Sequence, residues 1–278
     1  MKSITVFAIS IILFMFFSST THSQQMWNTG LTLKEFSVEY IKPTFQKTLT
    51  TLSGNVINFT GRVKMSDTKS FVVNLPYIQA KGAYNFFFLN TQEIIENTIG
   101  NIYLGFETRK ENVPFWTNLG IYLPTTPDNK IFATLVGAYS SPDHFEAFIP
   151  NSVLLTFRGN QQLNDKFGFG AITRIGVTGM LRTKIDENST IDRFEAFLNY
   201  AFQPTFTSET LNIIAGFSGR MFVTESGDLS QRVMHQIGTT ISYKISSYRP
   251  EIFIRIPINK SLKYLLENTY GASATIEF

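Results

Sequence analysis

The feature of this sequence that most constrains its fold is a two-residue alternation of apolar and polar side chains. Within residues 55–65, the odd positions from Ile57 onward hold apolar side chains or glycine and the even positions from Asn58 onward hold polar ones. Residues 231–245 repeat the pattern, with Ile237 beside Gln236. Successive side chains of a β-strand point to opposite faces, so each segment predicts a strand with one apolar and one polar face. Both segments are longer than a typical strand of a soluble sheet, which favours tilted strands that cross a membrane.

Segments with strand character follow one another along the chain. They cover residues 34–42, 55–65, 70–78, 99–110, 115–124, 151–159, 166–181, 191–203, 209–223, 231–245, 249–259 and 268–278. We therefore predict an all-β fold with about twelve strands. Residues 91–98 and 131–139 could each add a short helix or one more strand pair, which leaves fourteen strands as an alternative.

The connections between these segments alternate in length. They run 12, 4, 20, 4, 26, 6, 9, 5, 7, 3 and 8 residues, so every second connection is the shorter one. Short periplasmic turns alternate with longer external loops in the up-and-down barrels of bacterial outer membranes. The pattern predicts a transmembrane up-and-down antiparallel β-barrel with both termini in the periplasm, and it makes residues 79–98 and 125–150 long external loops.

The composition agrees with a barrel that turns an apolar face to lipid. The chain holds 27 Phe and 11 Tyr among 278 residues, with only 16 % charged residues, which is a large aromatic surface for a water-soluble protein. After residue 23 no window holds 18 consecutive apolar residues, so a helical membrane protein is excluded. Cysteine is absent, which excludes disulfides, thiolate metal sites and a cysteine nucleophile.

The first residues have the organisation of a secretory signal peptide. Lys2 is followed by an apolar stretch over residues 4–17 and by small polar residues that end at Ser23. This pattern predicts a cleaved signal peptide over residues 1–23 and one barrel domain over residues 24–278. Together with the strand pattern, it predicts export to the outer membrane of a Gram-negative bacterium.

The last segment alternates up to the final residue. Tyr270, Ile276 and Phe278 share one face, and Glu277 lies on the other. A last strand with alternate apolar residues and a terminal aromatic residue resembles the insertion signal of outer-membrane barrels. The resemblance implies recognition of Tyr270, Ile276 and Phe278 by the barrel-assembly machinery, with outer-membrane lipid and lipopolysaccharide as further partners.

A second resemblance lies in the middle of the chain. Residues 98–110 (TIGNIYLGFETRK), followed by residues 119–125 (LGIYLPT), resemble paired segments of small barrels of the phenol-degradation (MetA-pathway) and hydrophobic-compound transport type. In those families an Asp follows the glycine of the turn, whereas here Asn101 follows Gly100. Fatty-acid transporters of the wider group fill the lumen with an N-terminal hatch, for which only about ten residues are available here after the signal peptide.

The histidines give no catalytic pattern. Barrel hydrolases place a His and a Ser two residues apart on one strand, whereas Ile237 follows His235 and Glu146 follows His144 at that spacing. His144, with Asp143 and Glu146 nearby, could form a weak metal or acid–base cluster, but we predict a solvated loop histidine. We predict His235 to be an interfacial side chain. The chain is therefore expected to have no catalytic residues, no metal site, no cofactor and no enzymatic activity.

Charged side chains fall on the polar faces of the predicted strands. Those that we assign to the lumen are Arg62, Lys64, Glu107, Arg109, Arg174, Arg193, Glu195, Arg220, Arg255 and Glu277. They could interlock as ion pairs in a narrow barrel, for example Arg255 with Glu277 on adjacent strands. Alternatively, their basic excess could line a water-filled passage that favours anions.

Two functions are compatible with these features. The first is a channel or transporter for small, hydrophobic or anionic molecules across the outer membrane. The alternative is a closed barrel with a structural or surface-interaction role through its external loops. Nucleic-acid binding is not expected, because the net charge of +3 comes from basic residues spread along the chain rather than clustered on one face.

Overall fold

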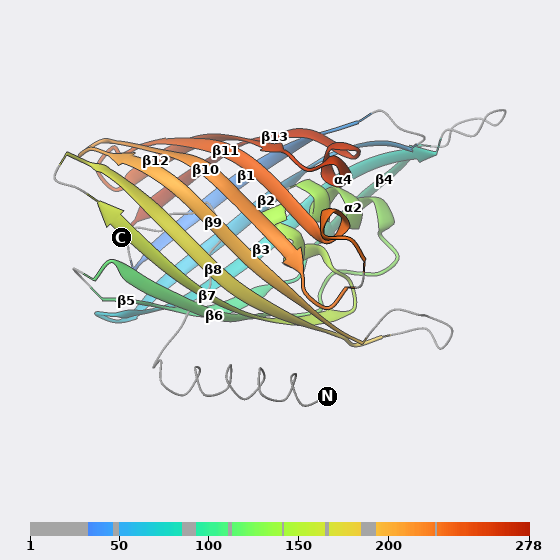
Figure 1. Cartoon of the computed structure of the whole chain (residues 1–278), viewed down its shortest axis with the longest axis horizontal. Coiled ribbons are helices and arrows are strands. Elements are labelled where there is room, and N and C mark those ends of the chain that lie inside the picture. Colours follow the sequence, from blue (N-terminus) through green and yellow to red (C-terminus); the bar gives the residue numbers. More distant parts are fainter. Residues whose placement is uncertain are drawn as a thin grey trace.

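The computed structural model describes residues 33–46, 50–84, 93–110, 113–140, 142–164, 167–184, 193–225 and 227–278. These residues form one antiparallel sheet that closes into a barrel of twelve strands, with one further strand beside the wall (Figure 1). The predicted signal peptide lies outside the described residues, as do residues 111–112 of the short connection predicted between residues 110 and 115.

The twelve predicted strands are all present, with shifted ends. The wall strands are β1 (Glu35–Phe45), β2 (Thr50–Ser66), β3 (Lys69–Tyr84), β5 (Tyr103–Arg109), β6 (Phe115–Tyr122), β7 (Ser152–Asn164), β8 (Phe169–Arg182), β9 (Phe194–Thr207), β10 (Leu211–Phe222), β11 (Val233–Tyr243), β12 (Tyr248–Pro257) and β13 (Leu266–Glu277). The additional strand is β4 (Glu93–Ile99). The helices are α2 (Ile131–Ser140), the 3-10 helix η1 (Pro142–Phe148), α3 (Leu229–Arg232) and α4 (Lys260–Lys263).

Wall strands adjacent in sequence pair with each other, and β13 pairs with β1 to close the barrel. β4 and β5 both pair with β3, because Tyr77 of β3 opposes Ile99 and Asn74 opposes Tyr103. The two strands therefore act as one strand that is interrupted between Ile99 and Tyr103. Residues 79–98, predicted as a long loop, contain the end of β3 and most of β4.

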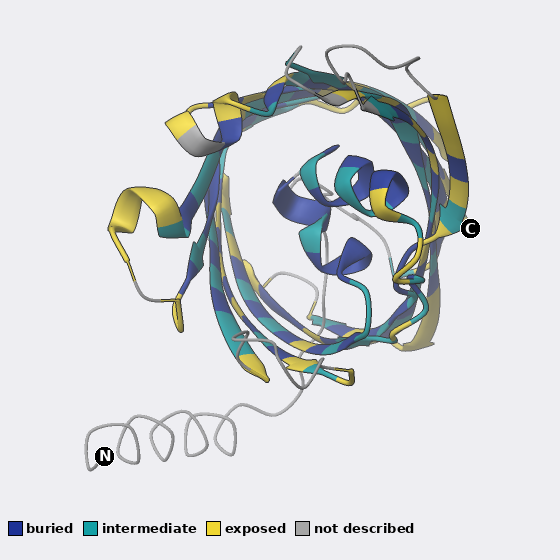
Figure 2. Ribbon diagram, turned by 90° about the vertical axis from the view of Figure 1, so that its right-hand side faces the viewer, coloured by how far each residue is buried: buried dark blue, intermediate teal, exposed yellow. Residues whose placement is uncertain are grey.

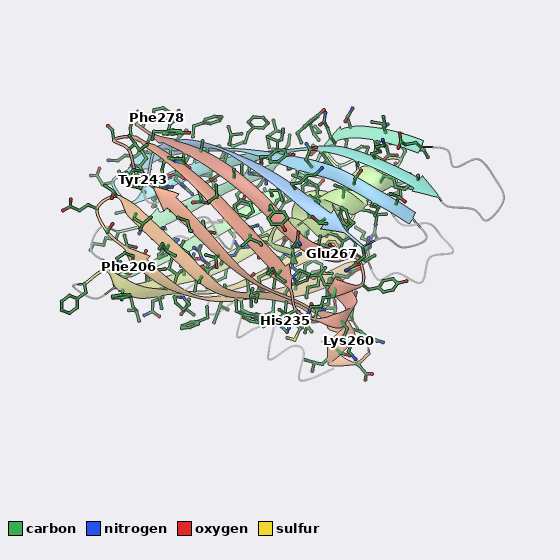
Figure 3. All side chains as sticks on the ribbon, turned by 90° about the horizontal axis from the view of Figure 1, so that it is seen from above. Phe206, His235, Tyr243, Lys260, Glu267 and Phe278 are labelled. Atoms are coloured by element: carbon green, nitrogen blue, oxygen red, sulfur yellow. The ribbon has the colours of Figure 1, made fainter. Side chains whose placement is uncertain are left out.

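The predicted faces are confirmed by burial. Ile237 is 43 % exposed on the outside of the barrel, whereas the neighbouring Gln236 is buried inside. Figure 3 shows Tyr243, Phe206 and Phe278 at the same end of the barrel, where the C-terminus also lies in Figure 1. We call this end, with the short turns, the turn end. The opposite end, with α2, α4 and β4, is the loop end (Figure 1).

The prediction that residues 125–150 form an external loop is wrong. After β6 the chain turns into the barrel, and α2 and η1 lie inside it (Figure 2). Phe132 and Val136 of α2 are buried in a cluster with the wall residues Ile41 and Ile78. α2 carries no charged side chain, so burial in the barrel removes its apolar surface from water.

No helix of the described residues is both long and apolar enough to span a membrane. Of the two uncertain segments, residues 131–139 form helix rather than a strand pair, and residues 93–98 belong to a single added strand.

Candidate functional site: a plug held by polar side chains

We call residues 123–140 and 142–151 the plug. The plug is attached at the break between β4 and β5. Asn101 lies in this break, is fully buried, and forms hydrogen bonds with the plug. The backbone N–H of Asn101 donates to Ala147 O at 2.6 Å, and its Nδ2 donates to Ile149 O at 2.7 Å. Its Oδ1 accepts from the N–H of Thr126 at 3.0 Å. An Asp, which the resembling families have here, could not donate the side-chain bond, so Asn101 suits this plug.

Both ends of α2 are fixed to the wall. Glu96 of β4 accepts a hydrogen bond at 2.9 Å from the N–H of Ala133, in the first turn of the helix, where a carboxylate also complements the helix dipole. Thr269 of β13 donates to Ser140 O at 2.6 Å, at the last residue of the helix. The helix therefore cannot slide along the barrel without breaking wall contacts.

The short helix η1 directs neighbouring side chains to different parts of the wall. Asp143 accepts a hydrogen bond at 2.5 Å from Gln236 of β11. His144 Nε2 lies 3.3 Å from Glu39 Oε2 of β1, and Asn58 of β2 donates to the same carboxylate at 3.0 Å. The predicted solvated histidine is therefore wrong, because its loop folds inward and buries it.

Glu146 faces a third part of the wall. Arg220 of β10 donates to Glu146 Oε2 at 2.5 Å, while Thr178 and Asn199 each donate to Oε1 at 3.3 Å. Asp143, His144 and Glu146 thus diverge instead of forming a cluster. Throughout the described part of the chain, no three His, Cys, Asp or Glu side chains gather as metal ligands.

An aromatic contact completes the plug. The Phe145 ring meets the rings of Phe197 and Phe222 edge to face, with centroids 6.1 and 5.8 Å apart. These rings belong to an apolar cluster with Leu154 and Met180. The plug is therefore seated by apolar packing and fixed in position by hydrogen bonds and ion pairs.

The residues that we assigned to the lumen lie in three environments. Those buried inside the barrel are Arg62, Glu107, Arg174, Arg220 and Arg255. Arg109, Glu195 and Glu277 are partly buried, and Glu195 pairs with Arg182 at 2.6 Å. Lys64 and Arg193 are exposed beyond the interior: Lys64 pairs with Asp67 in the β2–β3 turn, and Arg193 precedes β9.

The predicted ion pair between Arg255 and Glu277 is wrong. Arg255 opposes Thr269 near the loop end of β13, whereas Glu277 lies at the turn end of that strand. Glu277 instead pairs with Lys244 at 2.8 Å and with Arg249 at 3.4 Å.

Arg255 Nη2 lies 3.5 Å from Glu39 Oε1, and Arg255 Nη1 lies 4.0 Å from Asp143 Oδ2 of the plug. Arg62 pairs with Glu35 and, at 3.2 Å, with Glu107.

Sequence reasoning missed several buried charged groups. Glu35 and Arg158 belong to predicted strands, and the same alternation would have assigned both to the polar face. Asp143 and Glu146 had no comparable signal, because nothing in the sequence showed that their loop enters the barrel.

His235 and Tyr200 form a separate pair on the outside of the barrel. The Tyr200 hydroxyl lies 2.5 Å from His235 Nε2, and the Phe217 ring lies 5.0 Å from the imidazole ring. Figure 3 places His235 toward the loop end. Neither side chain contacts the plug, so this pair takes no part in the candidate site.

No protein-family model and no curated protein matches the chain. Among solved structures, the COG4313 outer membrane channel from Pseudomonas putida F1 matches with a TM-score of 0.57 and 7 % identity, over 92 % of this chain and 99 % of that one. The translocator domain of the autotransporter NalP from Neisseria meningitidis matches with a TM-score of 0.50 and 8 % identity, over 88 % of this chain and 87 % of that one. These similarities show the fold of an outer-membrane barrel and confirm the predicted fold class.

Proposed function

We propose that this chain is an outer-membrane channel for small molecules, held closed by its plug. The observation that carries the proposal is the plug itself: a segment of the chain lies inside the barrel and is fixed to the wall by hydrogen bonds and ion pairs of η1. Such contacts depend on charge and can be exchanged with water or solute. A barrel with a purely structural role would not need carboxylates of an inserted segment placed against arginines of its wall.

The position in the membrane is part of the same proposal. The outward side chains are predominantly apolar, and aromatic residues lie at the turn end (Figure 3). We infer that lipid and lipopolysaccharide surround this face, and that the strand ending in Phe278 is read by the barrel-assembly machinery after export through a signal peptide. The expected organism is a Gram-negative bacterium.

Planar-bilayer conductance tests the channel. The wild-type protein should show brief or small openings. The double variant Asp143→Asn/Glu146→Gln should open more often, because the plug then loses both carboxylates that face Arg255 and Arg220. An increase of at least several-fold in open probability is expected, with heat-modifiable gel mobility showing that the variant is folded.

Asp128→Asn is the matched control. Asp128 belongs to the same plug and undergoes the same chemical change, but it is exposed and contacts Lys184 and Asn151 instead of the interior wall. It should conduct like the wild type. If wild-type, control and double variant all fail to conduct, the closed structural barrel becomes the better account.

A further inference from the structure

Two diagonal rows of inward side chains climb the barrel wall from the turn end to the plug. Because the strands of a barrel are tilted, residues that lie opposite one another on successive strands do not stay at one level. The first row begins beside the β2–β3 turn and crosses β3, β5, β6 and β7. We call it the unbonded row, and its buried members, each opposite the next, are Ser70, Glu107, Asn118 and Arg158.

The unbonded row leads to the plug. Arg158 opposes Gly176, which opposes Asn199. Asn199 in turn opposes Arg220, the partner of Glu146 in the plug, and donates to the same carboxylate at 3.3 Å. The row therefore joins the turn end to the ion pair that holds one side of the plug.

Hydrogen bonds are missing along this row. Within the described residues, Ser70 Oγ, Asn118 Nδ2 and both Nε and Nη1 of Arg158 have no hydrogen-bond partner. Glu107 is paired by charge with Arg62, whose Nη2 lies 3.2 Å from Glu107 Oε2, but neither Glu107 oxygen accepts a well-formed hydrogen bond. Buried polar groups are nearly always hydrogen-bonded, and leaving them unsatisfied costs free energy. The closed barrel therefore bears such a cost along this row.

The unsatisfied atoms include both donors and acceptors. The Glu107 oxygens are acceptors, and the nitrogens of Asn118 and Arg158 are donors. The Ser70 hydroxyl can act as either. A ligand of one charge would satisfy only part of such a row. Water both donates and accepts hydrogen bonds, so it matches all four side chains.

The second row has hydrogen bonds in place. It begins at the turn end of β11, crosses β12 and β13 and ends on β1. We call it the bonded row, and its members, each opposite the next, are Ser242, Glu251, Ser273 and Glu39. Ser242 accepts from Asn212 at 3.5 Å, and the two middle members are bonded to each other. Glu39 accepts from Asn58 at 3.0 Å. Water would therefore satisfy fewer open positions in this row.

We propose that the channel opens along the unbonded row, so that water and small polar solutes pass between this row and the plug. Hydration of the row then offsets part of the cost of separating Glu146 from Arg220. The bonded row keeps its contact with the plug, where His144 Nε2 lies 3.3 Å from Glu39 Oε2. The proposal deepens the proposed function by naming the pathway, and it rests on that function for the existence of a conducting state.

Thiol modification tests the pathway in the intact protein. The chain has no cysteine, so an introduced cysteine is its only thiol. Ser70→Cys and Asn118→Cys lie in the unbonded row. Ser242→Cys is the matched control, because it makes the same change as Ser70→Cys at a position that is also buried and also one residue from the turn end of its strand.

The reagent is hydroxyethyl methanethiosulfonate, which is small and uncharged, added to the protein in lipid vesicles. It should modify Ser70→Cys and Asn118→Cys at least tenfold faster than Ser242→Cys. After unfolding in urea, all three variants should react at the same rate, which shows that the difference comes from the fold. Gel mobility with and without boiling shows that each variant is folded.

Conductance gives a second measurement on the same variants. Treatment of Asn118→Cys with the reagent should lower the single-channel conductance at least twofold, because the added group lies in the pathway. The same treatment of Ser242→Cys should leave the conductance unchanged.

The outcomes separate the pathway from the channel. Conductance with equal modification rates, or with faster modification of Ser242→Cys, overturns the pathway and leaves the channel standing. Fast modification of the unbonded row in a protein that never conducts overturns both, because the row would then line a closed recess. Absence of both modification and conductance also overturns both.

Discussion

Buried arginines have different partners in two arcs of the barrel interior. In the paired arc, formed by β10 to β13 with β1 and β2, Arg220, Arg255 and Arg62 each lie beside a carboxylate. In the donor-rich arc, formed by β6 to β8, Arg158 belongs to no ion pair of the described residues and Arg174 donates to amide oxygens. Both arcs bury guanidinium groups, but the ion pairs of Arg220, Arg255 and Arg62 have no counterpart at Arg158 among the described residues.

The plug explains much of the difference. Its acids, Asp143 and Glu146, form their ion pairs with Arg255 and Arg220 of the paired arc, where they add to the wall residue Glu39. The same contacts that neutralise the wall arginines also hold the plug. In the donor-rich arc Glu146 accepts a hydrogen bond from Thr178 of β8, and no ion pair of the described residues joins the plug to Arg158.

The largest effect is expected from breaking a pair in the paired arc. Arg220→Met leaves Glu146 as a buried carboxylate without its arginine, and removal of one partner of a buried pair typically costs about 3–5 kcal/mol. Urea unfolding of the membrane-reconstituted protein, followed by gel mobility, should show this loss. The double variant Arg220→Met/Glu146→Leu should recover a large part of it, because no lone charge remains. A loss below about 1 kcal/mol in the single variant would mean that the pair is already exposed to water.

The sequence was sufficient for the wall but not for these pairs. Alternation alone gave the twelve strands and correctly assigned side chains such as Gln236 and Ile237 to their faces. It could not show which carboxylate faces Arg255, because that depends on the register of β12 with β13 and on the plug, both of which are long-range features. In the sequence, Asn101 was only a departure from a family pattern. The structure shows that it forms hydrogen bonds with the plug.

The second effect compares the two faces of one strand in the paired arc. Ile237→Arg places a charge on the apolar outside, where Arg near the membrane midplane costs about 2–4 kcal/mol. Gln236→Arg points inside, beside Asp143, and should be tolerated better. The amount of heat-modifiable protein in the outer membrane should fall much further for Ile237→Arg. Equal yields would show that the register is displaced by one residue.

A smaller effect is expected in the donor-rich arc. Arg158→Met removes a buried charge without leaving a carboxylate unpaired, so the free energy of unfolding should change by no more than about 1 kcal/mol, or increase. The measurement is the same urea titration as for Arg220→Met. A loss as large as that of Arg220→Met would remove the distinction between the arcs.

The smallest effect is expected for an ion pair outside both arcs. Lys184 donates to Asp128 at 2.9 Å, and this bond, with a second from Asn151, holds the pKa of the Asp128 carboxyl below its ordinary value of 3.8. A carboxyl with a lowered pKa stabilises the folded state only while it is ionised. Its contribution is therefore present at neutral pH and is lost as the pH falls below about 4.

Asp128→Asn should reproduce the protonated form of this group. At neutral pH its unfolding midpoint should differ from that of the wild type by little more than the error of the measurement, because the pair is exposed to solvent and screened by salt. Below pH 3 the two proteins should behave identically. A large difference at neutral pH that persists in high salt would show that the contact with Lys184 is shielded from water. The ion pair at the plug surface would then be as buried as those of the interior arcs, and the comparison between them would fail.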